Sequence, residues 1–167
     1  GLAIGNLIGD IFGGTLGPAS IAGFWGNFLL GYLPYTLWTT LSPISGPSYV
    51  WQRKNWRSWV TYILIGVISA ASCGVIIGTA VDALGMVPYA LLSRIITLNN
   101  TIGAWIGAFF LLAVADVVQK QLGLFWPDVM AAAQTRRGVH VIGAWMVTAG
   151  AILGIAGSLM PGVDQAF

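Results

Sequence analysis

The sequence predicts an all-α protein, a polytopic transmembrane helical bundle of five to six spans with one short re-entrant or external element. Hydrophobic residues occupy 57% of the 167 positions and charged residues only 7%, against roughly 25% charged residues in ordinary soluble domains. Apolar runs near the 20 residues that cross a bilayer core recur along the chain. So few charged side chains are not enough to cover the surface of a soluble protein of this size. We therefore expect an integral membrane protein.

Five apolar stretches carry this prediction. They are expected at 1–18, 19–41, 59–84, 101–118 and 139–160. The first is rich in glycine and short, the second contains Pro34, and the third has no charge before Asp82. Residues 85–100 contain Pro88 and Arg94 and are too short and polar for a span, so a re-entrant or external element is expected there. Gly1 already lies in an apolar helical pattern, so we expect residues 1–167 to be a single transmembrane domain that lacks an N-terminal helix.

The positive charges indicate the orientation. Six of the seven Lys and Arg residues lie within or beside two connectors, 51–58 and 119–137, and such connectors favour the cytoplasmic side. An even number of crossings must then separate them, which the third and fourth spans supply if residues 85–100 do not cross. We expect a multi-pass protein of the cell (plasma or inner) membrane, with the lipid bilayer as its surroundings.

Glycines recur every four residues at the start of the chain, at positions 1, 5, 9, 13 and 17. Residues four apart lie on nearly the same face of a helix, and such a face lets a neighbouring helix approach closely in lipid. The same spacing of small residues occurs at Ala22/Gly26, Gly74/Gly78, Gly103/Gly107 and Gly150/Gly154. The pattern predicts a closely packed bundle in which the first glycine row seats a neighbouring helix.

Polar residues beside that row are the first candidates for a binding site. Asn6 and Asp10 are four residues apart and should lie near a helix seam, because a carboxylate in the bilayer is expensive unless it meets a partner or water. Asn27 repeats the Gly-Asn pairing and would face Asn6 in a hairpin, and Tyr35 follows Pro34, which would kink the helix. A structural hydrogen bond, a ligand cavity and ion coupling are the three interpretations of Asn6 and Asp10.

A second polar group comprises Asp82, Arg94, Asn99 and Asn100. Asp82 and Arg94 are candidates for an ion pair. The two asparagines are candidates to hold irregular backbone, which membrane proteins tolerate where it is buried in protein or lines a cavity. A small-molecule site open to the outside and a plain external loop both fit this pattern.

The sequence offers no catalytic or metal-binding set, and we expect no enzyme, no cofactor and no nucleic-acid partner. His140 is the single histidine and Cys73 the single cysteine, so the usual ligands for zinc are missing. Neither a G-x-S-x-G motif nor a phosphate-binding loop occurs.

The order of these features resembles a known family. "GNLIGDIFGG", "GPASIAGFWGNFLLGYLPYTLW", the basic "WQRKNWR", "SRIITLNNTIGAWIG" and "VVQKQLGLFWPD" follow one another as in the substrate-binding S components of energy-coupling factor (ECF) vitamin transporters. The resemblance covers residues 1–128. It implies a six-helix protein that captures a vitamin or related micronutrient and docks on a transmembrane coupling subunit driven by ATPase subunits. It also implies that Asn99, Asn100 and the polar residues of the first two spans contribute to substrate binding.

Two other classes of function remain open. A small ion channel or secondary transporter would act without an ATPase, since helices with Gly-Asn pairs and aromatic residues also occur in small anion channels. A structural membrane subunit or an intramembrane enzyme has less support from the residues.

Overall fold

The computed structural model describes residues 1–40, 56–120 and 139–160 of the protein. These ranges form helices and no strands: α1 (Leu2–Phe12), α2 (Pro18–Thr40), α4 (Trp56–Ala83), α5 (Tyr89–Lys120) and α7 (Val139–Ser158). The all-α prediction is confirmed. Two of the described helices, α4 and residues 141–158 of α7, are long and apolar enough to cross a membrane.

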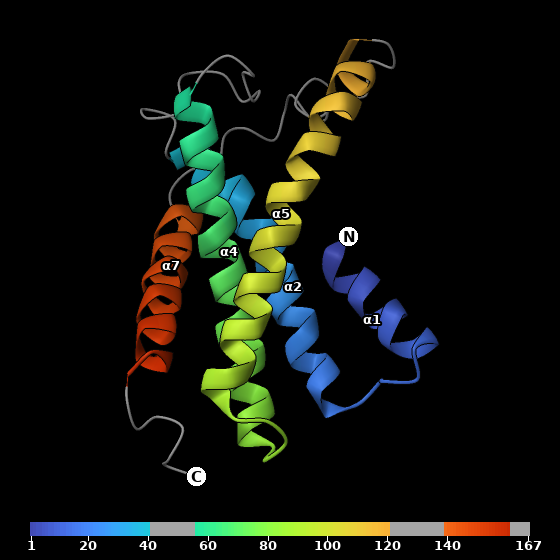
Figure 1. Ribbon diagram of the computed structural model, residues 1–167, viewed down its shortest axis with the longest axis vertical. Helices are drawn as coiled ribbons and strands as arrows, with labels where there is room; N and C mark the ends of the chain where they lie inside the picture. Colours follow the sequence, from blue (N-terminus) through green and yellow to red (C-terminus); the bar gives the residue numbers. More distant parts are fainter. Residues whose placement is uncertain (41–55, 121–138, 161–167) are drawn as a thin grey trace.

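Helix α4 occupies the centre of the bundle. It packs against α2, α5 and α7, and α1 packs on the outer side of α2. Successive helices run in alternating directions (Figure 1). Residues 69–74 of α4 are all buried. Six consecutive buried residues cover every face of a helix, and their small side chains let the neighbouring helices approach from several sides.

The predicted second, third and fifth spans correspond to α2, α4 and α7. Both limits of α2 lie within one residue of the predicted ones. Helix α4 begins three residues before the predicted Trp59, and α7 ends two residues before the predicted Met160. Buried Leu33 and Leu37 of α2, Ile65 of α4 and Ala144 of α7 form one apolar cluster. Long apolar runs therefore located these helices well.

The first predicted span is shorter than expected. Helix α1 has 11 residues, about 16 Å of helix, which is too short to cross a bilayer core of about 30 Å. It ends at Phe12 because a turn follows, and Gly14 in this turn has a φ of 68°, a conformation that favours glycine. The glycine-rich composition that predicted a packing face also ends the helix.

The prediction of a separate re-entrant or external element at residues 85–100 is wrong. Residues 89–120 form one continuous helix of 32 residues, α5, joined to α4 by a turn at 84–88. Pro88 precedes the helix and no further proline interrupts it. Polar residues such as Asn99 and Asn100 therefore continue the helix and do not form irregular backbone.

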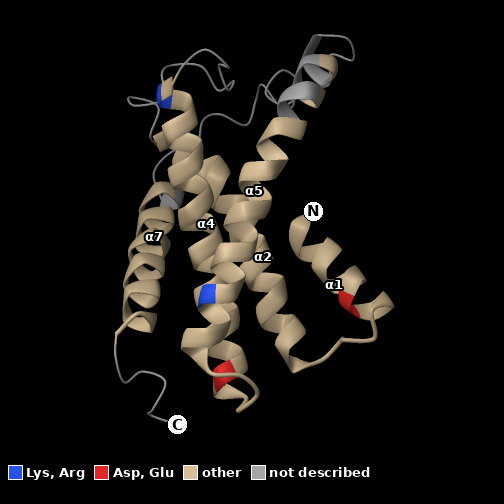
Figure 2. Cartoon of the chain, in the orientation of Figure 1, with Lys and Arg blue, Asp and Glu red and all other residues tan. Residues whose placement is uncertain are grey.

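Charge is distributed unequally between the two ends of the bundle. Arg57 lies at the start of α4 and α5 ends at Lys120, so the two basic connectors predicted to share a side of the membrane leave the same end of the α4–α5 hairpin. Two acidic residues lie toward the other end, Asp10 near the end of α1 and Asp82 near the end of α4 (Figure 2), whereas Asp116 lies four residues before Lys120 in α5.

The glycine row of α1 does not seat a neighbouring helix among the described residues, which corrects the sequence-based expectation. A Cβ atom added at Gly1, Gly5 or Gly9 would meet no other atom within 4 Å. Helix α1 instead contacts α2 through Asn6 and Leu2, which lie against Gly23 and Gly31 of α2. The small residues of this seam therefore belong to α2, and the glycine row of α1 faces outward.

Other small-residue pairs do form close contacts. A Cβ atom at Gly26 would lie 3.0 Å from Ile77 of α4, and one at Gly78 would lie 3.1 Å from the Cβ of Ser93 in α5. A Cβ at Gly74 would clash with the side chain of Thr97. In the pair Gly150/Gly154 only Gly154 packs, against Val75 and Tyr89, and Gly103 and Gly107 face open space.

Candidate functional site

A chain of hydrogen bonds connects α2, α1 and the turn between them. Asn27 Nδ2 donates to Asn6 Oδ1 at 3.0 Å and to the carbonyl oxygen of Gly23 at 2.9 Å. Asn6 Nδ2 donates to Asp10 Oδ2 at 3.3 Å, and Thr15 Oγ1 donates to Asp10 Oδ1 at 3.4 Å. The bond between Asn27 and Asn6 confirms that these two amides face each other and that Asn6 lies at the seam of α1 and α2. The bonds of Asp10 stay within α1 and the turn that follows it.

Local sequence explains how this chain forms. Asn6 and Asp10 are one turn apart on α1, so their side chains share a face. Gly23 leaves room for the Asn6 amide, since a Cβ atom there would lie 2.8 Å from Asn6 Nδ2. The turn after α1 brings Thr15 back, and its backbone N–H donates to the carbonyl oxygen of Asp10 at 2.9 Å. A short helix, a glycine and a tight turn together position one carboxylate and two amides.

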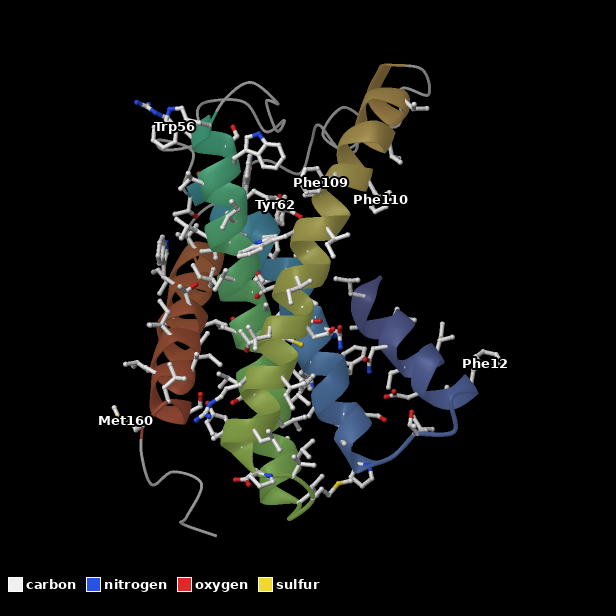
Figure 3. All side chains as sticks on the ribbon, viewed as in Figure 1. Phe12, Trp56, Tyr62, Phe109, Phe110 and Met160 are labelled. Atoms are coloured by element: carbon white, nitrogen blue, oxygen red, sulfur yellow. The ribbon has the colours of Figure 1, made fainter. Side chains whose placement is uncertain are left out.

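A second polar contact lies beside the first one. The side chain of Asn100 in α5 lies against that of Cys73 in α4, and a Cβ atom at Gly26 of α2 would lie 3.2 Å from Cys73 Sγ. Gly26 immediately precedes Asn27. Polar side chains from α1, α2, α4 and α5 therefore approach the same level of α2, and we call Asn6, Asp10, Asn27, Cys73 and Asn100 the polar layer. At mid-height in the view of Figure 3, oxygen, nitrogen and sulfur atoms appear beside α5, α2 and α1.

The polar layer has the chemistry of a hydrogen-bonding site. Each of its three amides carries both hydrogen-bond donors and an acceptor. Its carboxylate, when ionised, can only accept hydrogen bonds. Asn6, Asp10, Asn27 and Asn100 are partly exposed, whereas Cys73 is buried. No group of three or more His, Cys, Asp and Glu side chains in the described ranges is placed to hold a metal ion.

The proposed partnership of Asp82 and Arg94 does not form. Asp82 Oδ1 instead accepts a hydrogen bond from the backbone N–H of Tyr89 at 3.1 Å, which caps the first turn of α5. Arg94 Nε is buried and has no hydrogen-bond partner among the described residues. The first turn of α5 offers Asp82 a free N–H, and this local contact outcompetes a partner twelve residues away.

The two neighbouring asparagines of α5 point in different directions. Successive residues of a helix are rotated by about 100°, so Asn100 contacts Cys73 while Asn99 is exposed and makes no hydrogen bond to a described residue. Tyr35 is also exposed and lies eight residues beyond Asn27 on α2, about 12 Å along the helix axis. Of the sequence-predicted residues, Asn6, Asp10 and Asn27 are therefore joined by hydrogen bonds, and Asn100 lies against Cys73 of α4 at the same level of α2. Tyr35, Asp82, Arg94 and Asn99 lie apart from them.

Sequence reasoning missed Thr15, Gly23 and Cys73 as parts of this site. Thr15 lies in a turn where no helical spacing connects it to Asp10. Gly23 is four residues before Asn27, a spacing that could have identified it as the residue that leaves room for the amides. Cys73 ends the run of small residues before Gly74, which marks where α4 is approached most closely.

Comparison with protein-family models, curated proteins and solved structures found no match to this chain. Its resemblance to the S components of ECF transporters therefore stays a prediction, and any function must be argued from the residues themselves.

Proposed function

We propose that this chain is a multi-pass membrane protein that captures a small polar solute, a vitamin or a related micronutrient, for an uptake transporter energised by separate ATPase subunits. The observation that carries this proposal is the polar layer. Amides from α1, α2 and α5 approach one level of a bundle whose surroundings are apolar. Membrane proteins seldom keep such groups away from water unless they bind something or one another.

The membrane location is supported by composition and by charge. Helices α4 and α7 have the length and apolarity of membrane spans, and many large apolar side chains are exposed on the outside of the bundle. The basic connectors leave one end of the α4–α5 hairpin, which is the cytoplasmic end if positive charges stay inside. Asp10 and Asp82 then lie toward the external end, from which a solute would enter.

The chemistry of the polar layer favours an uncharged or weakly charged solute rich in hydrogen-bonding groups. Asn6 and Asn27 use only part of their donor and acceptor capacity in bonding each other. A solute with both donors and acceptors can take up the rest.

The energy source would lie in other subunits. The sequence contains no phosphate-binding loop, so a solute-capturing role requires a transmembrane coupling subunit and ATPase subunits as partners. The alternative of an ion channel or secondary transporter requires no such partners, and this difference makes the two functions separable by experiment.

Native mass spectrometry of the protein extracted from membranes tests the proposal. We expect a mass increment of a few hundred daltons from a bound small molecule, on the scale of vitamins, that disappears on unfolding. Ion flux by the purified chain in liposomes, together with the absence of any bound molecule, would contradict solute capture and favour a channel.

A further inference from the structure

The outer face of α5 carries an amide with no described partner. Asn99 is exposed, and all the residues three, four and seven positions away on the helix surface are apolar. Ile95, Ile102, Gly103 and Ile106 are exposed, whereas Leu92 and Ile96 are half-buried. A Cβ atom at Gly103 would meet nothing within 4 Å. The α5 face, meaning Asn99 and these four exposed residues, is therefore an apolar surface with a single polar group at its centre.

The position of Asn99 along the helix makes this exposure costly. Asn99 is ten residues beyond Tyr89, where α5 begins, so it lies about 15 Å along the helix axis. In a bilayer core of about 30 Å this is close to the middle plane. A primary amide facing hydrocarbon there loses all its hydrogen bonds to water. The face is expected to be covered by a surface that restores them.

The sequence pattern indicates what covers it. Leu92, Asn99 and Ile106 are seven residues apart and form one row along α5. One asparagine in an otherwise apolar seven-residue row sets the register and the number of chains in paired helices, because its amide bonds to the same amide of an identical helix. Asparagine also associates helices within membranes.

From these observations we infer that the α5 face is a dimer interface, in which Asn99 bonds to Asn99 of a second copy of this chain. The charge asymmetry described above inserts every copy in the same orientation. A two-fold axis along the membrane normal then sets two α5 helices parallel, with each residue of the row opposite its own copy. Gly103 beside Asn99 lets the two backbones approach. This inference uses the membrane location proposed above but not the solute.

The outward face of α7 lacks this combination. Helix α7 also exposes glycines, at positions 143, 150 and 157, but the large residues between them are apolar, among them Leu153. The described part of that face has no amide side chain that could hydrogen-bond to a second helix. Leu153 therefore provides a control position of similar exposure on a different helix.

The first experiment measures the number of chains per particle in lipid nanodiscs, by mass photometry, as a function of protein density before reconstitution. We expect wild-type protein to be dimeric and Asn99→Leu to dissociate about ten times more readily. Asn99→Leu combined with Ile106→Asn moves the amide one step along the same row and should restore the dimer. Asn99→Leu combined with Leu153→Asn moves it to α7 and should not.

A second experiment does not depend on the folding of the Asn99 variants. In a Cys73→Ser background, Ile106→Cys should form a disulfide between two copies in native membranes on mild oxidation, whereas Leu153→Cys should not. A monomeric wild type, an Asn99→Leu variant as dimeric as wild type, or equal cross-linking at both cysteine positions would overturn the inference. A monomer would mean that lipid covers the α5 face.

Discussion

Single amides control much of the packing at the edge of this bundle. Asn27 bonds to both Asn6 and the backbone of its own helix, so one side chain fixes α1 against α2. Four-residue spacing predicted that Asn6 and Asp10 share a face, and this is confirmed. Spacing did not reveal which face of α1 packs against α2, because the glycine row and the row of Asn6 and Asp10 are only one residue position apart. In the structure the face that carries Asn6 packs against α2.

We expect Asn27→Ala to loosen α1 from α2. The substitution removes the donor to Asn6 and leaves that amide with one partner fewer, so the free energy of unfolding should fall by about 1 kcal/mol. Equilibrium unfolding in mixed micelles measures this value. Thr79→Ala, at an exposed position of α4, is the control and should leave stability unchanged, and equal losses in both variants would contradict the role of Asn27.

Asp82 provides a second prediction for a single residue. Its carboxylate caps the first turn of α5 through the N–H of Tyr89, so Asp82→Ala should reduce stability by about 1 kcal/mol. Asp82→Asn keeps an acceptor at the same place and should retain most of the stability. Similar losses in the two variants, measured by the same unfolding experiment, would show that the cap is unimportant.

Among the helices, glycines separate into those that pack and those that face outward. Gly74 and Gly78 bring α5 onto α4, whereas Gly5 and Gly103 have open space around them. The i, i+4 spacing is identical in both groups. Sequence spacing therefore identifies rows of small residues but cannot tell which rows are occupied, since that depends on the direction from which the next helix arrives.

Two alanine substitutions test this separation. Gly74→Ala places a methyl group against Thr97 and 2.6 Å from the carbonyl oxygen of Ser93, and should cost about 1–3 kcal/mol or more through overpacking. Gly5→Ala meets no atom and should be neutral or stabilising by up to about 1 kcal/mol. The midpoint temperature of thermal unfolding in detergent compares the two variants. An equal loss of thermal stability in Gly5→Ala and Gly74→Ala would contradict the assigned contacts.

The continuity of α5 shows where the sequence misled. Pro88, Arg94 and two asparagines suggested a polar element outside the membrane. Pro88 precedes α5, however, and Arg94 and the asparagines lie inside the helix without interrupting it. A helix needs only compatible backbone and a cap, which Asp82 supplies. Apolar runs predicted α2, α4 and α7 correctly, because the length and hydropathy of a run are enough to predict such helices. The contact between Cys73 and Asn100 depends on the crossing of α4 and α5, which no local pattern encodes.

At the scale of the whole molecule, the two ends differ in charge and are expected to face opposite sides of the membrane. The turn between α4 and α5, which includes exposed Met86, lies at the end opposite to Trp56. In a Cys73→Ser background, Met86→Cys should react with a membrane-impermeant maleimide in intact cells, and Trp56→Cys only after permeabilisation. Labelling of both positions in intact cells would contradict this topology.

The polar layer contains side chains from four helices, and the proposed solute capture depends on it. Native mass spectrometry of matched variants tests this claim most directly. Wild type and Thr79→Leu should retain the same bound small molecule, whereas Asn27→Leu and Asn100→Leu, each isolated as monodisperse folded protein, should lose it. Retention by both amide variants at the wild-type level, or the absence of any bound molecule from wild type, would contradict the account.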